Sequence, residues 1–407
     1  MYKIFFSIIL LLGLLSCGTE KKSGDKAPEF EIKTATANGT APYLTTDNHG
    51  VPVLCWTTLD EKSHRYFLSY AKWDYKKNTF GATKEVRQTL GMQKHKESMG
   101  KIAFKSDGTA IVAYGVSKPT KENRFAGYVA YTVSKDDGKT WSKPVRLVDE
   151  KKSQSQRFFD MARLPDGEVG MSWLDNRKLE PEKEGSSLYF AKTNDKDVFS
   201  DEKGLVGSTC QCCRTDIFVD SKNAIHIAFR DIIKDTIRDM KHVFSLDTGK
   251  TFSKAYLISE DNWVISGCPH TGPSIAENEK GLAYAWFTMG GGEGVYFCKA
   301  IDYTKNHKRI LVSNKLYHPQ MIGVKNAKYI LAGEEIDNIG DIYFGRITAS
   351  KLNTSKVLNK TYITGKTSDN SHAVLTKLTE DKILMAWTKH KKTHDEIDYS
   401  VIDLDKI

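Results

Sequence analysis

The sequence predicts an all-β fold, a β-propeller built from four-stranded blades, and three observations support this prediction. No stretch of the 407 residues shows a long helical period of apolar residues. One pattern recurs instead: an apolar strand, a polar turn, a second strand that ends in an aromatic residue, and a third strand rich in Tyr, Phe and Ala. The copies follow one another at about 46 to 59 residues with no linker between them, which is close to the size of a propeller blade.

The N-terminal segment predicts export. Residues 4–16 are apolar after a basic start, and they are too few to span a bilayer as a helix, which needs about 20 residues. Ser16 followed by Cys17 resembles the cleavage box of bacterial lipoproteins, in which the cysteine becomes the lipidated first residue. We therefore predict a membrane-anchored protein outside the cytoplasm, with a signal peptide over 1–16, a lipidated Cys17 and polar tether over 17–28, and a single propeller domain over 29–407.

The repeated units number seven and are recognised by their second strands. In chain order these strands end at or near Trp56, Tyr114, Trp173, Phe229, Trp286, Ala332 and Trp387. The unit around Ala332 has the weakest pattern, and without it the ring would have six blades.

The two ends of the propeller domain predict how the ring closes. The last unit stops at Ile407 after its third strand, whereas residues 30–36 precede the first unit and have no other partner. We expect this N-terminal segment to supply the outer strand of the last blade, because closure removes the sheet edges that an open array would expose.

Two turns share the pattern S-x-D-x-G-x-T-[WF], at Ser134–Trp141 and Ser245–Phe252. In such a turn the Asp accepts backbone N–H bonds, the Gly takes a positive φ, and the aromatic residue packs back on the blade. The pattern resembles the Asp-box, or BNR repeat, of sialidase-like propellers, and the resemblance covers nearly the whole chain after the tether at the level of blades. It implies a structural role for Asp136 and Asp247. Sialidases have six blades, so a count of seven departs from that family.

One face of the predicted ring collects polar residues. The connections from the fourth strand of one blade to the first strand of the next share this face with the second-to-third connections, opposite the Asp-box turns. In six of the seven units a His, Cys or Arg stands just where the innermost strand begins, so we expect a pocket at the axial mouth. These candidates are His95, Arg157, Cys210, Cys212, Cys213, Arg214, Cys268, His270, His318 and His372.

The four cysteines of this face allow two interpretations. An exported compartment permits disulfides, for instance between the Cys210 loop and Cys268. Alternatively, Cys210, Cys212, Cys213 and Cys268 bind a transition metal, copper or zinc, together with imidazole ligands. If Cys212 and Cys213 lie in an extended strand, their side chains point to opposite sides and do not share one partner. The nitrogen candidates are His95, His270, His318 and His372.

The resemblance to sialidases implies a further function, glycoside hydrolysis. Sialidases hold a substrate carboxylate with three arginines, and they use a Tyr paired with a Glu as nucleophile and an Asp as acid/base. The first unit lacks the [FY]-R-I-P segment that sialidases carry near the N-terminus. Matching residue types on this face are Arg157, Arg214 and Arg230 for the clamp, Asp160, Asp175 and Asp231 for the acid, and Tyr317 with Glu97 or Glu293 for the nucleophile pair.

The remaining polar residues of this face bind a ligand or form ordinary surface ion pairs, and they are Arg177, Arg230, Asp231, Arg238 and Asp239.

The formal charge of +9 is scattered without a nucleic-acid motif, so we expect no nucleic-acid partner. The sequence thus predicts an anchored propeller that binds a small acidic molecule, a glycan or a transition metal. A sialidase-like hydrolase and a non-catalytic interaction propeller remain the alternatives.

Overall fold

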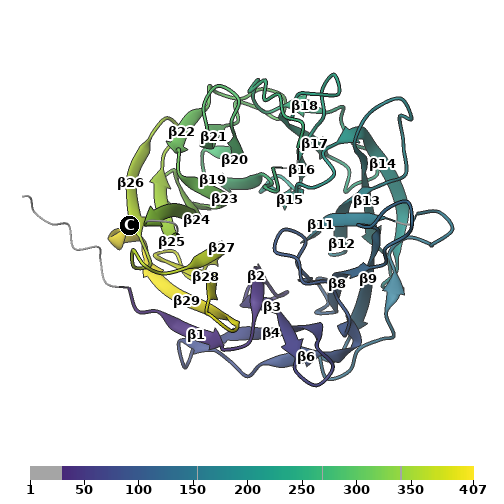
Figure 1. The fold of residues 1–407 in the computed structure, drawn as a ribbon, viewed down its shortest axis with the longest axis horizontal. Helices are drawn as coiled ribbons and strands as arrows, with labels where there is room; N and C mark the ends of the chain where they lie inside the picture. Colours follow the sequence, from purple (N-terminus) through teal and green to yellow (C-terminus); the bar gives the residue numbers. More distant parts are fainter. Residues whose placement is uncertain (1–29, 154, 268, 340–341) are drawn as a thin grey trace, which may run out of the picture.

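The protein forms a ring of seven antiparallel sheets around a central axis (Figure 1). The computed structural model describes residues 30–153, 155–267, 269–339 and 342–407. Among these residues the only helical segments are two 3₁₀ turns, η1 (Arg87–Thr89) and η2 (Leu404–Lys406). None of the described helices has the length and apolar character needed to cross a membrane. The predicted all-β propeller with seven blades is confirmed, and the six-blade alternative is wrong.

Each of the first four blades has its strands in chain order from the axis outward. Blade 1 contains β2 (Thr40–Thr46), β3 (Pro52–Asp60), β4 (Arg65–Asp74), β5 (Thr79–Phe80) and β6 (Lys84–Val86). Blade 2 contains β7 (Lys101–Phe104), β8 (Ala110–Ser117), β9 (Gly127–Ser134) and β10 (Val145–Arg146). Blade 3 contains β11 (Gln156–Arg163), β12 (Val169–Asp175), β13 (Ser186–Thr193) and β14 (Phe199–Thr209). Blade 4 contains β15 (Asp216–Val219), β16 (Ile225–Arg230), β17 (Met240–Ser245) and β18 (Tyr256–Leu257).

The last three blades complete the ring, and the weak unit around Ala332 is a full blade. Blade 5 contains β19 (Ser274–Asn278), β20 (Gly281–Thr288), β21 (Gly294–Lys299) and β22 (Ile310–Ser313). Blade 6 contains β23 (Leu316–Val324), β24 (Lys328–Ile339), β25 (Ile342–Leu352) and β26 (Val357–Tyr362). Blade 7 contains β27 (Asn370–Lys377), β28 (Lys382–His390), β29 (Asp395–Asp403) and β1 (Lys33–Thr36).

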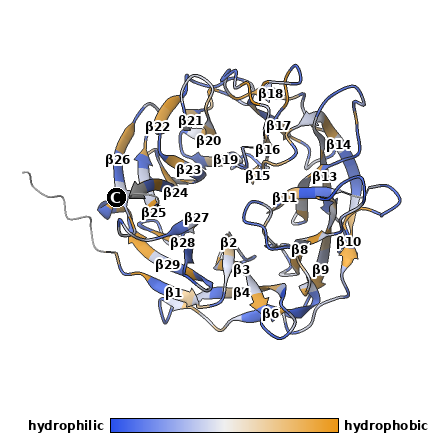
Figure 2. Cartoon of the chain, in the orientation of Figure 1, coloured by the Kyte–Doolittle hydropathy of each residue, from blue (hydrophilic) through white to orange (hydrophobic). Residues whose placement is uncertain are grey.

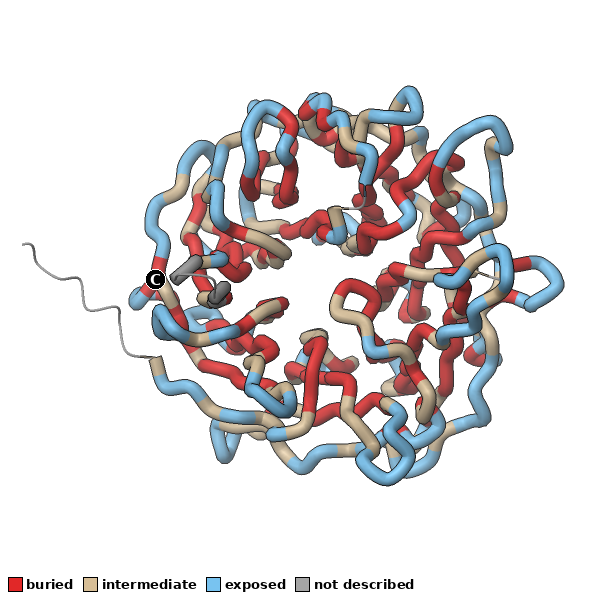
Figure 3. The backbone as a smooth tube through the Cα atoms, viewed as in Figure 1, coloured by how far each residue is buried: buried red, intermediate tan, exposed pale blue. Residues whose placement is uncertain are grey.

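The hydrophobic core lies between the blades. Seven clusters of buried apolar residues each combine side chains from two neighbouring blades, including the pair formed by blades 7 and 1. Figure 2 shows hydrophobic residues in the strands of every blade, and Figure 3 shows that the buried backbone follows these strands while the loops are exposed. The aromatic ends of four second strands are buried in these clusters, at Trp56, Trp173, Trp286 and Trp387. Each blade thus buries apolar side chains against both of its neighbours, and a blade taken alone would expose them.

The ring closes through the N-terminal strand, as predicted. β1 pairs antiparallel with β29 and is the outermost strand of blade 7. Thr34 Oγ1 donates to Asp398 Oδ1 at 2.7 Å, and Ser400 Oγ donates to the carbonyl of Glu31 at 2.9 Å. Figure 1 shows β1, at the start of the colour scale, beside β29 at its end.

The turns at Ser134–Trp141 and Ser245–Phe252 have the same internal hydrogen bonds. Asp136 accepts the Thr140 N–H at 2.9 Å, and Asp247 accepts the Thr251 N–H at 2.9 Å. In each turn the threonine hydroxyl also donates to the same carboxylate, and this bonding lowers the pKa of both aspartates to about 2. The two carboxylates are therefore engaged within their own turns.

Candidate functional site

A cavity of about 680 Å³ opens on the predicted face, between blades 2, 3 and 4. We call it the mouth pocket. It is formed by the loop before β7, the loop after β8, the ends of β11, β12 and β13, and the turn before β15. Its lining residues are Gln93, His95, Ser117, Asn123, Arg124, Phe125, Ser155, Arg157, Phe158, Leu174, Asn176, Lys178, Gly185, Ser186, Gln211, Cys212 and His270.

The mouth pocket is cationic. Arg124, Arg157 and Lys178 line it, and no Asp or Glu is among its described lining residues. Arg157 forms no ion pair with a described carboxylate, and its buried Nε has no hydrogen-bond partner among the described atoms. Burial lowers the pKa of Arg157, as expected where no anion compensates the charge. The guanidinium carbons of Arg124 and Arg157 lie 4.5 and 5.7 Å from the centre of the Phe125 ring.

His95 joins the mouth pocket to the central axis. Its Nδ1 accepts the backbone N–H groups of Glu97 and Ser98 at 3.1 and 3.0 Å. The ring packs edge-on against Phe158, with 5.4 Å between ring centres. Burial lowers the pKa of His95, so the ring favours the neutral state.

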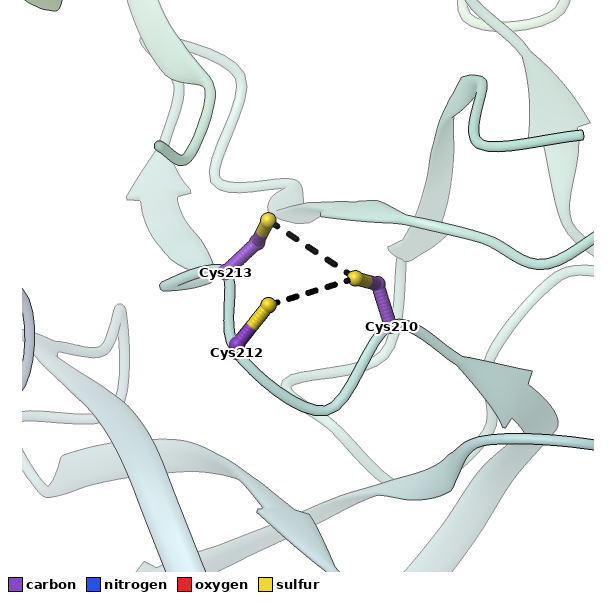
Figure 4. Close-up of side chains that lie close together, drawn as sticks. All are labelled: Cys210, Cys212 and Cys213. Atoms are coloured by element: carbon purple, nitrogen blue, oxygen red, sulfur yellow. Dashed lines mark hydrogen bonds between the residues drawn. The ribbon is translucent and has the colours of Figure 1, made fainter. Parts of the chain in front are cut away.

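Three cysteine sulfurs converge in the turn before β15 (Figure 4). Cys210 Sγ lies 3.7 Å from Cys212 Sγ and 3.9 Å from Cys213 Sγ, and all three side chains are buried. The prediction that Cys212 and Cys213 point to opposite sides is wrong, because the segment is a turn and not an extended strand. Burial opposes ionisation of Cys213, but the two neighbouring thiols and Arg230 hold the pKa of this thiol well below its usual range.

A second cluster, which we call the axial cluster, lies at the inner ends of blades 2, 4, 6 and 7. Glu97 Oε1 lies 3.3 Å from His372 Nε2 and 3.8 Å from His318 Nε2, and Glu97 Oε2 lies 3.4 Å from an Arg214 nitrogen. The two histidine rings stack with 4.2 Å between their centres. Glu334 binds His318 Nδ1 and accepts the His372 backbone N–H.

The charges of the axial cluster are internally balanced. Burial alone would raise the pKa of Glu97, but Arg214 and the two histidines hold it far below its ordinary value. Burial likewise opposes a charge on His318, yet Glu334 raises the pKa of His318 to about 9. Burial lowers the pKa of His372. At neutral pH the cluster therefore carries charged His318 beside neutral His372, with Glu97 and Glu334 ionised.

Backbone bulges place the two axial histidines. His318 and His372 have φ of 46° and 55°, and the pairing of their strands with β24 and β28 shifts register at these points. Ala41 and Phe158 have the same left-handed backbone at the matching shifts of β2 and β11. A bulge turns the side chain out of the regular alternation of a strand, which explains how neighbouring blades bring their histidines together.

Most of the remaining predicted ligand residues are engaged elsewhere. Asp175 is paired with Arg177 at 2.8 Å, and Arg177 also binds Glu202. Asp231 is paired with Lys241 rather than with the neighbouring arginine. Asp239 accepts the backbone N–H groups of Asn262 and Trp263, whereas the Nε and one terminal nitrogen of Arg238 are buried without a described partner.

The predicted arginine clamp and nucleophile pair are only partly assembled. Among Arg157, Arg214 and Arg230, only Arg157 lines the mouth pocket. Arg214 pairs with Glu97 and donates to a backbone carbonyl, and Arg230 donates to backbone carbonyls. Tyr317 donates to Glu293 Oε1 at 2.9 Å, outside the mouth pocket, and Glu97 belongs to the axial cluster. Asp160 is paired with Lys101 at 2.6 Å in the central channel.

Two predictions on cysteines lie outside the described residues, namely lipidation of Cys17 and any role of Cys268. The five described cysteines form no disulfide with one another.

Four functional candidates carry no motif that singles them out in the sequence. Arg124, Phe125 and Lys178 belong to second-to-third connections, so their place on the mouth face was available from the repeat pattern alone. Glu334 lies inside β24, shortly after the apolar run of that strand, and a carboxylate next to such a run is a feature that the sequence does display.

Comparison with known proteins supports the fold alone. No protein-family model and no curated protein sequence matches the chain. Among solved structures, the polysaccharide lyase Uly1 is similar with a TM-score of 0.54 and 11% identity, over 95% of this chain and 94% of the lyase. A Dyadobacter fermentans protein described as of unknown function has a TM-score of 0.52 and 13% identity, over 91% and 99%. The leech intramolecular trans-sialidase, solved with 2,7-anhydro-Neu5Ac, has a TM-score of 0.50 and 10% identity, over 94% and 93%. The chain is thus a propeller with a sialidase-like fold.

Proposed function

We propose that this chain is an exported propeller of the sialidase-like superfamily that binds an acidic saccharide in the mouth pocket. The observation that carries the proposal is the charge of that pocket, which has three cationic side chains and no carboxylate among its described lining residues. An anionic ligand is attracted by these groups, and no carboxylate of the described residues pairs with them, although Lys178 also donates to two backbone carbonyls.

The other lining residues suit a sugar. Gln93, Asn123, Asn176 and Gln211 offer amides, and three serines offer hydroxyl groups, so the ring hydroxyls of a saccharide find both donors and acceptors. Phe125 provides an aromatic ring near the guanidinium groups of Arg124 and Arg157. The neighbours named as a polysaccharide lyase and a trans-sialidase support a saccharide as the ligand class, although their likeness extends only to the fold.

Arg157 is the residue on which the binding should depend most. Its guanidinium has no described anionic partner, so it can hold a ligand carboxylate in fork geometry. We expect Arg157→Ala to weaken binding of sialic acid and glucuronate oligosaccharides by about tenfold or more, which corresponds to one lost charge-assisted hydrogen bond. Titration calorimetry with these sugars and with neutral oligosaccharides of equal length measures the effect.

Arg87→Ala is the matched control, because Arg87 lies in η1 and is already paired with Asp60 and Glu85. Equal affinity for acidic and neutral sugars, or unchanged binding by Arg157→Ala, would contradict the proposal. Release of free sugar during the titrations would instead support the hydrolase alternative, for which the Tyr317–Glu293 contact is the one favourable observation.

The proposal includes a lipid anchor at Cys17, which the box at residues 16–18 supports. Lipidation would hold the propeller at a membrane with its pocket outside the cytoplasm. We expect the full chain, expressed in a bacterium with lipoprotein processing, to partition into detergent, and Cys17→Ser to move it to the aqueous phase. Aqueous partition of both proteins would refute the anchor and leave the saccharide proposal untouched.

A further inference from the structure

The cysteine turn before β15 has the dimensions of a metal site. The two printed sulfur separations are 3.7 and 3.9 Å, and all three sulfurs lie within 4.8 Å of one another. A metal with metal–sulfur bonds of about 2.3 Å separates its tetrahedral sulfur ligands by about 3.8 Å. The sulfurs therefore already stand at ligand spacing, and Figure 4 shows the three side chains pointing toward one another. Little movement is needed to bring them onto one cation.

The turn is buried in an apolar cluster. Cys210, Cys212 and Cys213 pack in one core cluster with Phe158, Phe229 and Ile232, and their exposed fractions are 1%, 5% and 2%. The Cys210 N–H donates to the carbonyl of Arg230 at 2.9 Å, which fixes the turn to the end of β16. Sulfur ligands in an apolar shell favour soft cations over the hard cations that prefer oxygen.

A buried cation stands at the end of the strand to which the turn is fixed. Arg230 has an exposed fraction of 1%, and its guanidinium donates to the carbonyls of Arg238, Thr271 and Phe287. It forms no ion pair with a carboxylate in the described part of the chain. Three thiolates around a monovalent or divalent cation carry a net charge of −2 or −1, so an uncompensated arginine beside them lowers the cost of burial.

We propose that Cys210, Cys212 and Cys213 bind one thiophilic cation, Cu(I) or Zn(II), as thiolates. Each thiol that becomes a ligand gives its proton to solvent, and no electron is transferred. Cys212 also lines the mouth pocket, so the bound cation would lie in the pocket wall. The site is distinct from the axial cluster, where Arg214 already pairs with Glu97 and opposes a further positive charge.

The test is metal titration of the full chain after reduction of its thiols under anaerobic conditions. Cu(I) is added in competition with bicinchoninate, and Zn(II) in competition with a chromophoric chelator, while elemental analysis gives the stoichiometry. We expect one cation per chain for the better of the two metals. We expect Cys212→Ser and Cys213→Ser each to weaken binding by about 100-fold or more, since each removes one of three thiolates.

Cys298→Ser is the matched control, because Cys298 is equally buried but lies within β21. Circular dichroism and thermal unfolding show whether each variant is folded, and a thiolate-to-metal absorption band, obtained with Co(II) for the zinc case, reports sulfur ligation directly.

The proposal is overturned if the reduced chain binds neither metal, or if both cysteine variants bind as tightly as the parent. Loss of binding in Glu97→Gln but not in the cysteine variants would assign the metal to the axial cluster and would also overturn it. Saccharide binding is measured separately, so neither outcome depends on the proposed function.

Discussion

We expect a single carboxyl group in the central channel to couple the stability of the ring to pH. The channel is a cavity of about 140 Å³ lined by the innermost strands, and Asp160, Asp216 and Ser274 occupy matching positions in β11, β15 and β19. Each accepts a backbone N–H from the next blade, at Ile217, Ile275 and Met321. Burial and the charge of Asp160 raise the pKa of Asp216 to about 7.

The raised pKa of Asp216 means that its contribution to the stability of the fold falls as the pH rises. An acid whose pKa is higher in the folded state binds its proton more tightly there than in the unfolded chain, where the pKa is about 3.9. Its protonated form therefore stabilises the fold fully below about pH 4, and this contribution is lost as the pH rises to about 7. Above that range the folded ring holds an ionised, buried Asp216 beside Asp160, and Arg214 and Lys101 offset this charge only in part.

We expect Asp216→Asn to raise the free energy of unfolding by roughly 2 kcal/mol at pH 8 and to leave it unchanged at pH 4. Asparagine keeps an oxygen that can accept the Ile275 N–H but cannot ionise. Asp216→Ala is the matched comparison and should show a smaller gain or none, because that N–H loses its partner. Urea unfolding at the two pH values measures both, and an Asp216→Asn curve that tracks the parent at pH 8 would contradict the assigned charge repulsion.

Other residues of the mouth face show what the sequence could and could not establish. The repeat pattern placed Arg157, Cys212 and His270 on one face, because loops at equivalent positions of a ring converge, and these residues do line one pocket. It could not distinguish Arg157 from Arg214 and Arg230, because the difference lies in which arginine finds a carboxylate or backbone carbonyls inside the fold. Hydrogen-bond partners of this kind are set by tertiary packing and have no sequence pattern.

At the scale of the element, strands were predictable and their irregularities were not. The second strands end in aromatic residues because each blade needs a large apolar side chain between its neighbours, and this requirement produces a visible period. The bulges at Phe158, His318 and His372 leave no such trace, since they place non-glycine residues at positive φ where Gly or Asn is usual. The stacking of His318 on His372 was therefore beyond the sequence, although both residues were candidates.

The backbone conformation of the cysteine turn could not be predicted from the sequence for a related reason. Residues 210–213 connect the long strand β14 to β15, and nothing in their composition distinguishes a tight turn from the continuation of either strand. A strand would separate the side chains of Cys212 and Cys213, whereas the turn gathers three sulfurs on one side. The chemistry of the site thus depends on the local backbone conformation. The neighbouring blade fixes this conformation through the hydrogen bond from the Cys210 N–H to the carbonyl of Arg230.

At the scale of the whole molecule, a closed ring is the condition for every shared site. The innermost strands contact one another in succession from β2 through β27 and back to β2, and the core cluster between blades 7 and 1 completes the set. The axial cluster combines residues from four blades, and the mouth pocket from blades 2 to 4 and the loop that carries His270. Opening the ring at one place would relax the positions of the blades on both sides of the gap.

The N-terminal strand is the element whose removal tests this closure. β1 covers the outer edge of β29, Phe30 packs against the core between blades 6 and 7, and Ala35 packs against the core between blades 7 and 1. We expect a chain of residues 38–407 to unfold with a free energy about 3 kcal/mol or more below that of residues 30–407, from lost apolar burial and lost backbone pairing. The bare edge of β29 should also promote self-association, because unpaired strand edges pair with other chains.

Urea unfolding and light scattering measure the two effects, and the full-length chain beside residues 30–407 controls for the tether. Equal unfolding midpoints for the two truncated chains would show that blade 7 holds without its outer strand, and closure would then rest on the apolar contacts between blades alone.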